Sequence, residues 1–234
     1  MSTADLFDTP KPSTGQGKLV RRHAITEVGL QHFQAAYPGE TITREDIFYY
    51  VYGLLHSPGY RERYADNLAK ELPRIPCVKT AADFRAFSTA GRALGELHVN
   101  YDSVPMYAGA KIEHGNTSLS TADYRVEKMK YGKKGKEKDL TTIIYNRRIT
   151  VSGIPLEAYD YIVNGKSAID WVVERQGVRE DKASGIVNDA NDWATETMQS
   201  PRYPLELLLR VITVSLETQR IVASLPALDI HEAG

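Results

Sequence analysis

The densest run of chemically active side chains lies near the middle of the chain. Between Arg125 and Thr150 there are nine basic residues and three acidic ones, a net charge of +6, so the other 208 residues carry −7 of the total charge of −1. Basic side chains neutralise phosphates, and each such contact releases counterions from a nucleic acid. The segregation of charge, which the near-neutral total hides, therefore points to a polyanionic partner.

The segments that carry these charges have the composition of β-strands. Residues 124–131 and 141–150 are rich in β-branched and aromatic side chains, and the polar stretch 132–139 separates them. We expect a two- or three-stranded antiparallel ribbon, with a further short strand over 148–151. A two-stranded ribbon fits the major groove of DNA. The alternative is a solvated hairpin whose lysines only keep it soluble and block edge pairing.

Two roles are expected for the basic side chains of this ribbon. Arginine pairs bidentately with guanine, so the arginines are the expected base readers, whereas lysines on a mobile tip are expected to hold phosphates. Groove or phosphate contacts are assigned to Arg125, Lys128, Lys130, Arg147 and Arg148. Contacts from the tip are assigned to Lys133, Lys134, Lys136 and Lys138.

Three polar residues outside the ribbon are further candidates for DNA contact. Lys166 follows Asn164-Gly165, but Asp160 stands where a phosphate-binding loop needs its first glycine, so only a phosphate contact beside a helix N-terminus is expected. Asn188 and Asn191 could pair bidentately with adenine. The same residue types form ordinary Asx turns, which is the interpretation that we favour for this stretch.

The residue types that make active sites do not assemble into one in this sequence. Asp170 and Glu180-Asp-Lys182 echo the carboxylates of metal-dependent nucleases, but they fall in a predicted helix cap and a loop rather than on adjoining strands. The six histidines form no metal-ligand pair, and Cys77 is the one cysteine. His98 is expected to be a hydrogen-bonded core histidine. We expect no catalysis, no metal and no cofactor.

Helical patterns on both sides must position the ribbon. Thr43-Arg-Glu-Asp46 has the form of a capping box, Ser57-Pro58 ends one helix and starts the next, and residues 84–98 recur with helical spacing. Helices are also expected over 156–163, closed by Asn164-Gly165, from Ser167 to about Gly177, and over 203–224, with a loop at 178–192. The expected fold class is α+β, mainly α: a helical bundle with an inserted basic antiparallel β-ribbon.

These patterns divide one recognition domain into four stretches. Residues 1–18 are expected to be a flexible leader or linker, 19–100 a helical subdomain, 101–153 a loop with the basic ribbon, and 154–234 a helical segment packing on the first. No apolar run reaches the roughly 18 residues of a membrane span. A single cysteine fits a reducing compartment. We expect a cytoplasmic protein with no membrane partner.

Six segments together resemble the C-terminal specificity domain of type ISP restriction–modification enzymes. They are ITREDIFYYVYGLLHSP at 42–58, LPRIP at 72–76, YRVEKM at 124–129, IPLEAY at 154–159, VNGKSAI at 163–169 and DKASGI at 181–186. The resemblance runs from about residue 25 to residue 225, and the segments occur in the family's order.

The resemblance implies a role that composition does not show. Members of this family are long polypeptides with a nuclease, a helicase-like translocase and an adenine-N6 methyltransferase, and this domain recognises the duplex DNA target. The chain has no Asn-Pro-Pro-Tyr or Asp-Pro-Pro-Tyr methylation motif, so it is expected to be the recognition piece, with those domains as partners. The alternative is an interaction module that docks the methyltransferase or translocase and touches DNA only non-specifically.

Overall fold

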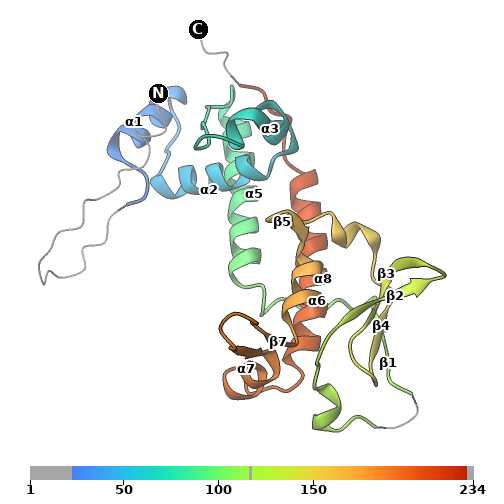
Figure 1. The fold of residues 1–234 in the computed structure, drawn as a ribbon. Helices are drawn as coiled ribbons and strands as arrows, with labels where there is room; N and C mark the ends of the chain where they lie inside the picture. The colour runs from blue at the N-terminus through green and yellow to red at the C-terminus, as the bar shows by residue number, and fades with distance from the viewer. Residues whose placement is uncertain (1–22, 116–117, 231–234) are drawn as a thin grey trace, which may run out of the picture. The chain divides into compact units, whose positions relative to one another are not determined.

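The computed structural model describes residues 23–115 and 118–230 (Figure 1). The expected leader at 1–18 lies outside this range. The fold is mainly α with small antiparallel sheets and is 47% helical, which confirms the expected class. In the described residues no helix has the length and apolar character needed to cross a membrane. The chain forms two compact units: Met1–Glu96 with Arg220–Gly234, and Leu97–Gln219.

The first unit is helical, and its caps follow the sequence signals. Thr43 and Asp46 form the predicted capping box, and the Ser57 side chain caps the helix that starts at Pro58. The helices are α1 Glu27–Ala36, α2 Arg44–His56, α3 Pro58–Arg63, α4 Ala65–Leu68 and α5 Ala81–Val99, the last of which continues into the second unit at Leu97.

Buried tyrosines organise the core of the first unit. The hydroxyl of Tyr37 donates to the carbonyl of Val78 at 2.7 Å, that of Tyr50 to Pro76 at 2.7 Å, and that of Tyr60 to Arg74. The tyrosine rings pack with Phe33, Phe84 and other apolar side chains in one cluster. Three backbone carbonyls of the irregular segment 74–78 are therefore satisfied by tyrosines of this core.

The second unit contains a four-stranded antiparallel sheet, larger than the expected ribbon. Its order is β1-β4-β3-β2, with strands β1 Lys111–Glu113, β2 Lys130–Lys134, β3 Glu137–Ile144 and β4 Thr150–Ser152. The expected strand over 124–131 is wrong for most of its length, because Thr121–Tyr124 is a 3-10 turn (η2) and residues 125–129 have no strand partner. Their backbone is bonded instead by residues much later in the chain, as described below.

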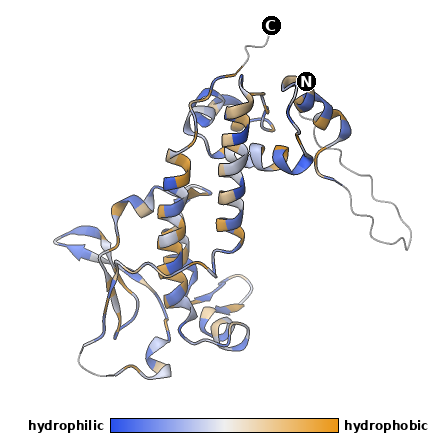
Figure 2. Cartoon of the chain, turned by 180° about the vertical axis from the view of Figure 1, so that it is seen from behind, coloured by the Kyte–Doolittle hydropathy of each residue, from blue (hydrophilic) through white to orange (hydrophobic). Residues whose placement is uncertain are grey.

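The β2–β3 hairpin projects from this sheet. Strand β3 pairs with β4 only from Thr142 to Ile144, whereas its pairing with β2 continues to Glu137 opposite Lys134 (Figure 1). A register shift occurs at Gly132, where an added Cβ would lie 3.0 Å from the Cβ of Thr142. Such bulges bend a ribbon and redirect its side chains. The hairpin is hydrophilic out to its turn (Figure 2).

The expected helix over 156–163 is wrong. The structure has a 3-10 turn, η3 Leu156–Tyr159, followed by a hairpin of β5 Ile162–Val163 and β6 Lys166–Ser167. Asn164 and Gly165 have φ values of 49° and 82°, the left-handed pair that a tight hairpin turn requires. Asn-Gly therefore marks a strand reversal here and not a helix end. Ser167 caps α6 Ala168–Arg175 as predicted.

The region expected as a loop at 178–192 is also structured. It forms a further hairpin, β7 Val178–Glu180 with β8 Val187–Asp189, and the start of α7 Ala190–Glu196. The final helix, α8 Tyr203–Ala223, was predicted almost to the residue. Its apolar side chains Leu205, Leu208 and Ile212 are buried in the cluster that also holds Ile143 and Ile169. This core fixes the sheet and α6 within one unit.

Candidate nucleic-acid interface

Two adjoining hollows carry most of the basic residues of the second unit. The first is a groove of about 700 Å³ bordered by β2, α6 and the start of β7. The second, of about 550 Å³, is bordered by η2, the segment 125–130 and the turn after β3. Glu127, Lys128 and Lys130 line both. The segment 125–130, from the end of η2 to the first residue of β2, is therefore the wall along which the two hollows meet.

This wall is held by residues that follow α6 in the sequence. The amide of Asn191 bonds both the N–H and the carbonyl of Val126, and the N–H of Val178 donates to the carbonyl of Glu127 at 2.9 Å. At Gly177 an added Cβ would stand 2.7 Å from that same carbonyl oxygen, so the close approach needs glycine. The segment is thus held by backbone and side-chain bonds without belonging to a sheet.

An ion-pair cluster fixes the start of the wall. The Arg125 guanidinium donates to Glu127 at 2.8 Å and to Asp189 at 2.7 Å. Burial alone would raise the pKa of Asp189, but its hydrogen bonds from Arg125 and Asn191 outweigh this and hold the pKa below the ordinary value. Asp189 therefore stays ionised at neutral pH and keeps Arg125 turned toward β8.

Half of the predicted basic residues are compensated by carboxylates. Lys138 lies 3.9 Å from Asp170 and 3.8 Å from the ring centre of Tyr131, and the hydroxyl of Tyr131 donates to Asp170. Burial opposes ionisation of Asp170, but these partners and Ser167 lower its pKa. The other compensated pairs are Arg125–Asp189, Lys134–Asp139, Arg148–Asp123 and Lys166–Glu174.

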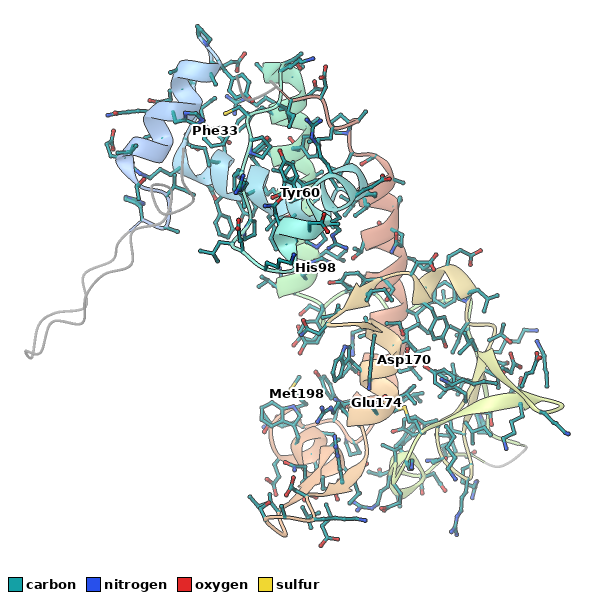
Figure 3. The ribbon with its side chains drawn as sticks, turned by 45° about the horizontal axis from the view of Figure 1, so that its top comes forward. Phe33, Tyr60, His98, Asp170, Glu174 and Met198 are labelled. Atoms are coloured by element: carbon teal, nitrogen blue, oxygen red, sulfur yellow. The ribbon has the colours of Figure 1, made fainter. Side chains whose placement is uncertain are left out.

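The remaining basic side chains keep their charge uncompensated. All of them are exposed, line one or both hollows, and form no ion pair within 4.0 Å in the part of the chain that the structure describes. They are Lys128, Lys130, Lys133, Lys136 and Arg147. The three acids of the first groove do not offset them, because each already has a basic partner. These acids are Glu127 and, on consecutive turns of α6 (Figure 3), Asp170 and Glu174. The hollows therefore present net positive charge to solvent.

The structure changes the setting of the predicted tip. Lys133, Lys134 and Lys138 lie in the strands, and Lys136 lies in the turn beside Gly135, whose φ is +64°. Lys134 lines neither hollow. The tip is therefore a paired hairpin rather than a long loop.

The three predicted residues outside the ribbon also lie outside the hollows. Asn191 is only 9% exposed and uses its amide on the backbone of Val126, so the structure gives it a supporting role. Lys166 is bonded by Glu174 at the β5–β6 hairpin. Asn188 is exposed on β8. Asp189 caps α7 with its side chain, but Asn188 lies in β8 and Asn191 in α7, so neither asparagine forms the turn that we favoured.

Sequence reasoning missed two residues of the first groove. Arg179 and Gln176 line it from the end of α6 and the start of β7, which the sequence predicted as a helix end and a loop. Val178-Arg-Glu180 is too short to show a strand periodicity, so the sequence offered no signal for this strand. His98 is hydrogen-bonded to Thr218 at 2.8 Å and stacks on Tyr161, as expected of a core histidine. No cluster of three or more metal-ligating side chains occurs among residues 23–115 and 118–230.

The chain matches a known family over most of its length. The model of the Type ISP C-terminal specificity domain matches residues 3–207. A comparison with curated proteins gives no match.

Three solved structures are similar to this chain. A nuclease-deletion mutant of the Type ISP restriction–modification enzyme LlaGI, in complex with a DNA substrate mimic, is 45% identical over 82% of this chain, with a TM-score of 0.70. The ATP-dependent Type ISP enzyme LlaBIII bound to DNA is 40% identical over 89%, with a TM-score of 0.75. A DrdV–DNA complex is 34% identical over 87%, with a TM-score of 0.70. The chain spans 17%, 12% and 20% of those three chains.

Proposed function

Because the chain belongs to the family of Type ISP C-terminal specificity domains, we propose that it recognises a specific sequence in duplex DNA for a restriction–modification enzyme. In this proposal adenine-N6 methylation, translocation and cleavage are carried by other domains, which are the protein partners of this one. The chain itself is not an enzyme. The observation that carries the proposal is the group of five uncompensated basic side chains lining two hollows at the base of a projecting hairpin.

The dimensions of the hairpin suit a groove of DNA. Strand β2 has five residues, which at about 3.3 Å each give roughly 16 Å of extended chain. The major groove is about 12 Å wide and 8.5 Å deep and admits a two-stranded ribbon. A hairpin of this length can enter the groove while its lysines reach the phosphates on either side.

The basic residues fall into two groups, according to whether a carboxylate already holds the side chain. Lys133 and Lys136 project from the hairpin without a carboxylate partner in the described residues and are proposed to grip phosphates. Arg147 lines the second hollow beside Ile144, which is 42% exposed, so it is the proposed base reader there, with Ile144 available to a thymine methyl group. Arg125 and Arg148 are proposed as supports, because carboxylates already orient them.

Binding and selection in one experiment test the proposal. The 234-residue chain is titrated into pooled random duplexes by fluorescence anisotropy at several salt concentrations, and the bound DNA is sequenced. Phosphate contacts by the four lysines Lys128, Lys130, Lys133 and Lys136 predict a slope of log K against log salt of about −4. An enriched asymmetric motif is expected beside this slope.

A matched pair of double variants locates the binding surface. Lys133→Ala with Lys136→Ala is expected to flatten the salt slope by about 2 and to weaken all sequences alike. Lys70→Ala with Lys111→Ala makes the same charge change in the first unit and on β1, the opposite edge of the sheet, and is expected to leave binding unchanged. Equal effects of the two pairs of substitutions on binding would reject the hairpin as the DNA-binding surface. No binding even at low salt would reject DNA recognition in favour of a module that docks a catalytic partner.

A further inference from the structure

A second two-stranded ribbon borders the first groove. In the β7–β8 hairpin, Arg179 stands directly opposite Asn188, whereas the neighbouring pairs are Val178 with Asp189 and Glu180 with Val187. Residues directly opposite each other in an antiparallel pair project from the same face, and the next pair projects from the other. Arg179 lines the groove that also holds Lys128 and Lys130. Asn188 therefore shares the face of a residue that borders the basic groove.

Both side chains are free to bind. Arg179 and Asn188 are exposed, and neither side chain has a hydrogen bond or an ion pair to any residue of 23–115 or 118–230. Arg179 makes only a weak electrostatic contribution to Asp181. The pKa of Asp181 is lowered mainly by hydrogen bonds with Ser184 and Ala183, and the charge of Arg179 adds the least. The neighbouring polar side chains are already bonded, because Asp189 accepts from Arg125 and Asn191 accepts from the backbone of Val126.

The ribbon is anchored on the wall between the two hollows. The N–H of Val178 bonds Glu127, the N–H of Ala190 bonds the carbonyl of Gly177 at 3.1 Å, and the N–H of Asp181 bonds the carbonyl of Ile186 at 2.8 Å. These bonds fix both ends and the base of the turn of the hairpin. Arg179 and Asn188 are thereby held at a set position relative to Lys128 and Lys130.

The charge around the pair favours base edges over phosphates. Residues 178–192 contain two basic and four acidic side chains, a net charge of −2. This negative charge repels a phosphate, whereas an element that binds phosphates gathers arginines and lysines. Arginine pairs bidentately with the O6 and N7 of guanine, and asparagine with the N6 and N7 of adenine. Directly opposite Cβ atoms are about 5 Å apart, close to one base-pair step of about 3.4 Å.

We propose that Arg179 and Asn188 form a second base-reading element, which recognises a guanine and an adenine on neighbouring base pairs. The inference rests on the proposed function and adds to it two specificity-determining residues on a ribbon separate from the basic hairpin. DNA lying in the first groove would contact the β2–β3 hairpin by its phosphates and this pair by its base edges.

The test compares the motifs selected by the whole chain and by four variants. Arg179→Ala and Asn188→Ala are each expected to relax one position of the selected motif, by about 5- to 150-fold in preference, at adjacent positions. Arg179→Lys keeps the charge but loses the bidentate fork, so it is expected to relax the same position with an unchanged salt slope. Arg175→Ala removes an exposed arginine that stacks on Trp171 outside both hollows, and it is expected to keep the wild-type motif.

The outcomes separate this inference from the proposed function. If the wild-type chain selects a motif and the Arg179 and Asn188 variants select the same motif, the pair does not read bases, although recognition by the chain stands. If the wild-type chain binds without selecting a motif, sequence-specific recognition fails, and this inference fails with it. Thermal unfolding of each variant checks the fold, and because both side chains are exposed, midpoints within about 2 °C of wild type are expected.

Discussion

The side-chain amide of Asn191 hydrogen-bonds both polar groups of the Val126 backbone, with its Oδ1 accepting from the N–H at 2.9 Å and its Nδ2 donating to the carbonyl at 2.9 Å. The two residues are 65 positions apart in the sequence. One buried side chain thus supplies to Val126 the pairing that a neighbouring strand would supply. The basic wall owes its position to a residue that need not touch DNA.

Replacement of this amide is expected to destabilise the second unit. Asn191→Ala leaves the buried N–H and carbonyl of Val126 without partners, at a cost of about 1–3 kcal/mol for each group. The free energy of unfolding, measured by urea titration, is expected to fall by roughly 2–5 kcal/mol. Asn188→Ala, on the exposed face of β8, is the control and is expected to stay within about 0.5 kcal/mol. Similar losses for both variants would contradict the role of Asn191.

The Arg125–Asp189 pair is expected to make stability depend on pH in the acid range. The folded state lowers the pKa of Asp189 from its ordinary value of 3.8, so the unfolded chain takes up this proton first as the pH falls. The stabilisation is complete above about pH 4 and is lost as the pH drops through the lowered value. A double-mutant cycle of Arg125→Ala and Asp189→Asn is expected to give a coupling energy of about 1 kcal/mol at pH 7.

The same cycle at low pH is the check. The coupling energy is expected to shrink between pH 4 and pH 2, where Asp189 takes up its proton. A coupling energy that stays constant over this range would show that the charge of Asp189 does not hold Arg125.

The Arg125→Ala variant also reports on DNA binding. Because this arginine supports the wall, its loss is expected to weaken binding without relaxing one motif position.

His56 is expected to give the first unit a pH dependence near neutrality. Burial lowers the pKa of its ring below 6.5, with Arg61 adding to the effect and the hydrogen bond with the Tyr52 carbonyl opposing it. The unfolded chain therefore binds a proton more readily, so stability rises with pH through the window below about 6.5, by at most about 1.4 kcal/mol per pH unit. Urea titrations between pH 5 and pH 7.5 measure this slope. His56→Gln is expected to flatten it, and an equal slope in both proteins would exclude His56 as the cause.

The crossing of α2 and α5 is expected to tolerate no side chain at Gly91. A Cβ there would lie 1.8 Å from the carbonyl oxygen of Tyr49, so the helices would have to separate. Gly91→Ala is expected to destabilise the first unit by about 1–3 kcal/mol in thermal unfolding. At Gly59, in helix α3, the nearest atom to a Cβ is 3.5 Å away, and Gly59→Ala is expected to be neutral or stabilising by up to about 1 kcal/mol. Equal effects at the two glycines would contradict this account.

The elements that sequence reasoning predicted are those with local signals. Thr43 and Ser57 each cap a helix through a residue three positions away, so the local sequence is enough to predict the cap. The β5–β6 and β7–β8 hairpins were missed because strands of two or three residues show no periodicity. Asn164-Gly165 fits both a helix end and a hairpin turn, and the choice depends on the packing of η3 and α6 around it.

The same distinction between local and distant signals applies to the candidate site. The excess of basic residues between Arg125 and Thr150 was visible in the sequence, and the structure gathers eight of the nine around two hollows. Which of them keep a free charge was not visible, because compensation depends on distant residues: Arg125 meets Asp189 across 64 positions. Arg179 was missed because its strand has three residues and was predicted as a loop.

The lining of the two hollows comes from one continuous piece of chain. Every residue that borders them lies between Ala122 and Arg179, but the supports Asp189 and Asn191 lie beyond that stretch. A graft that moved the target preference of one relative onto another would therefore have to run past the β7–β8 hairpin into α7. Cut at the end of β7, the transplanted lysines would arrive without the carboxylate and the amide that hold their wall in place.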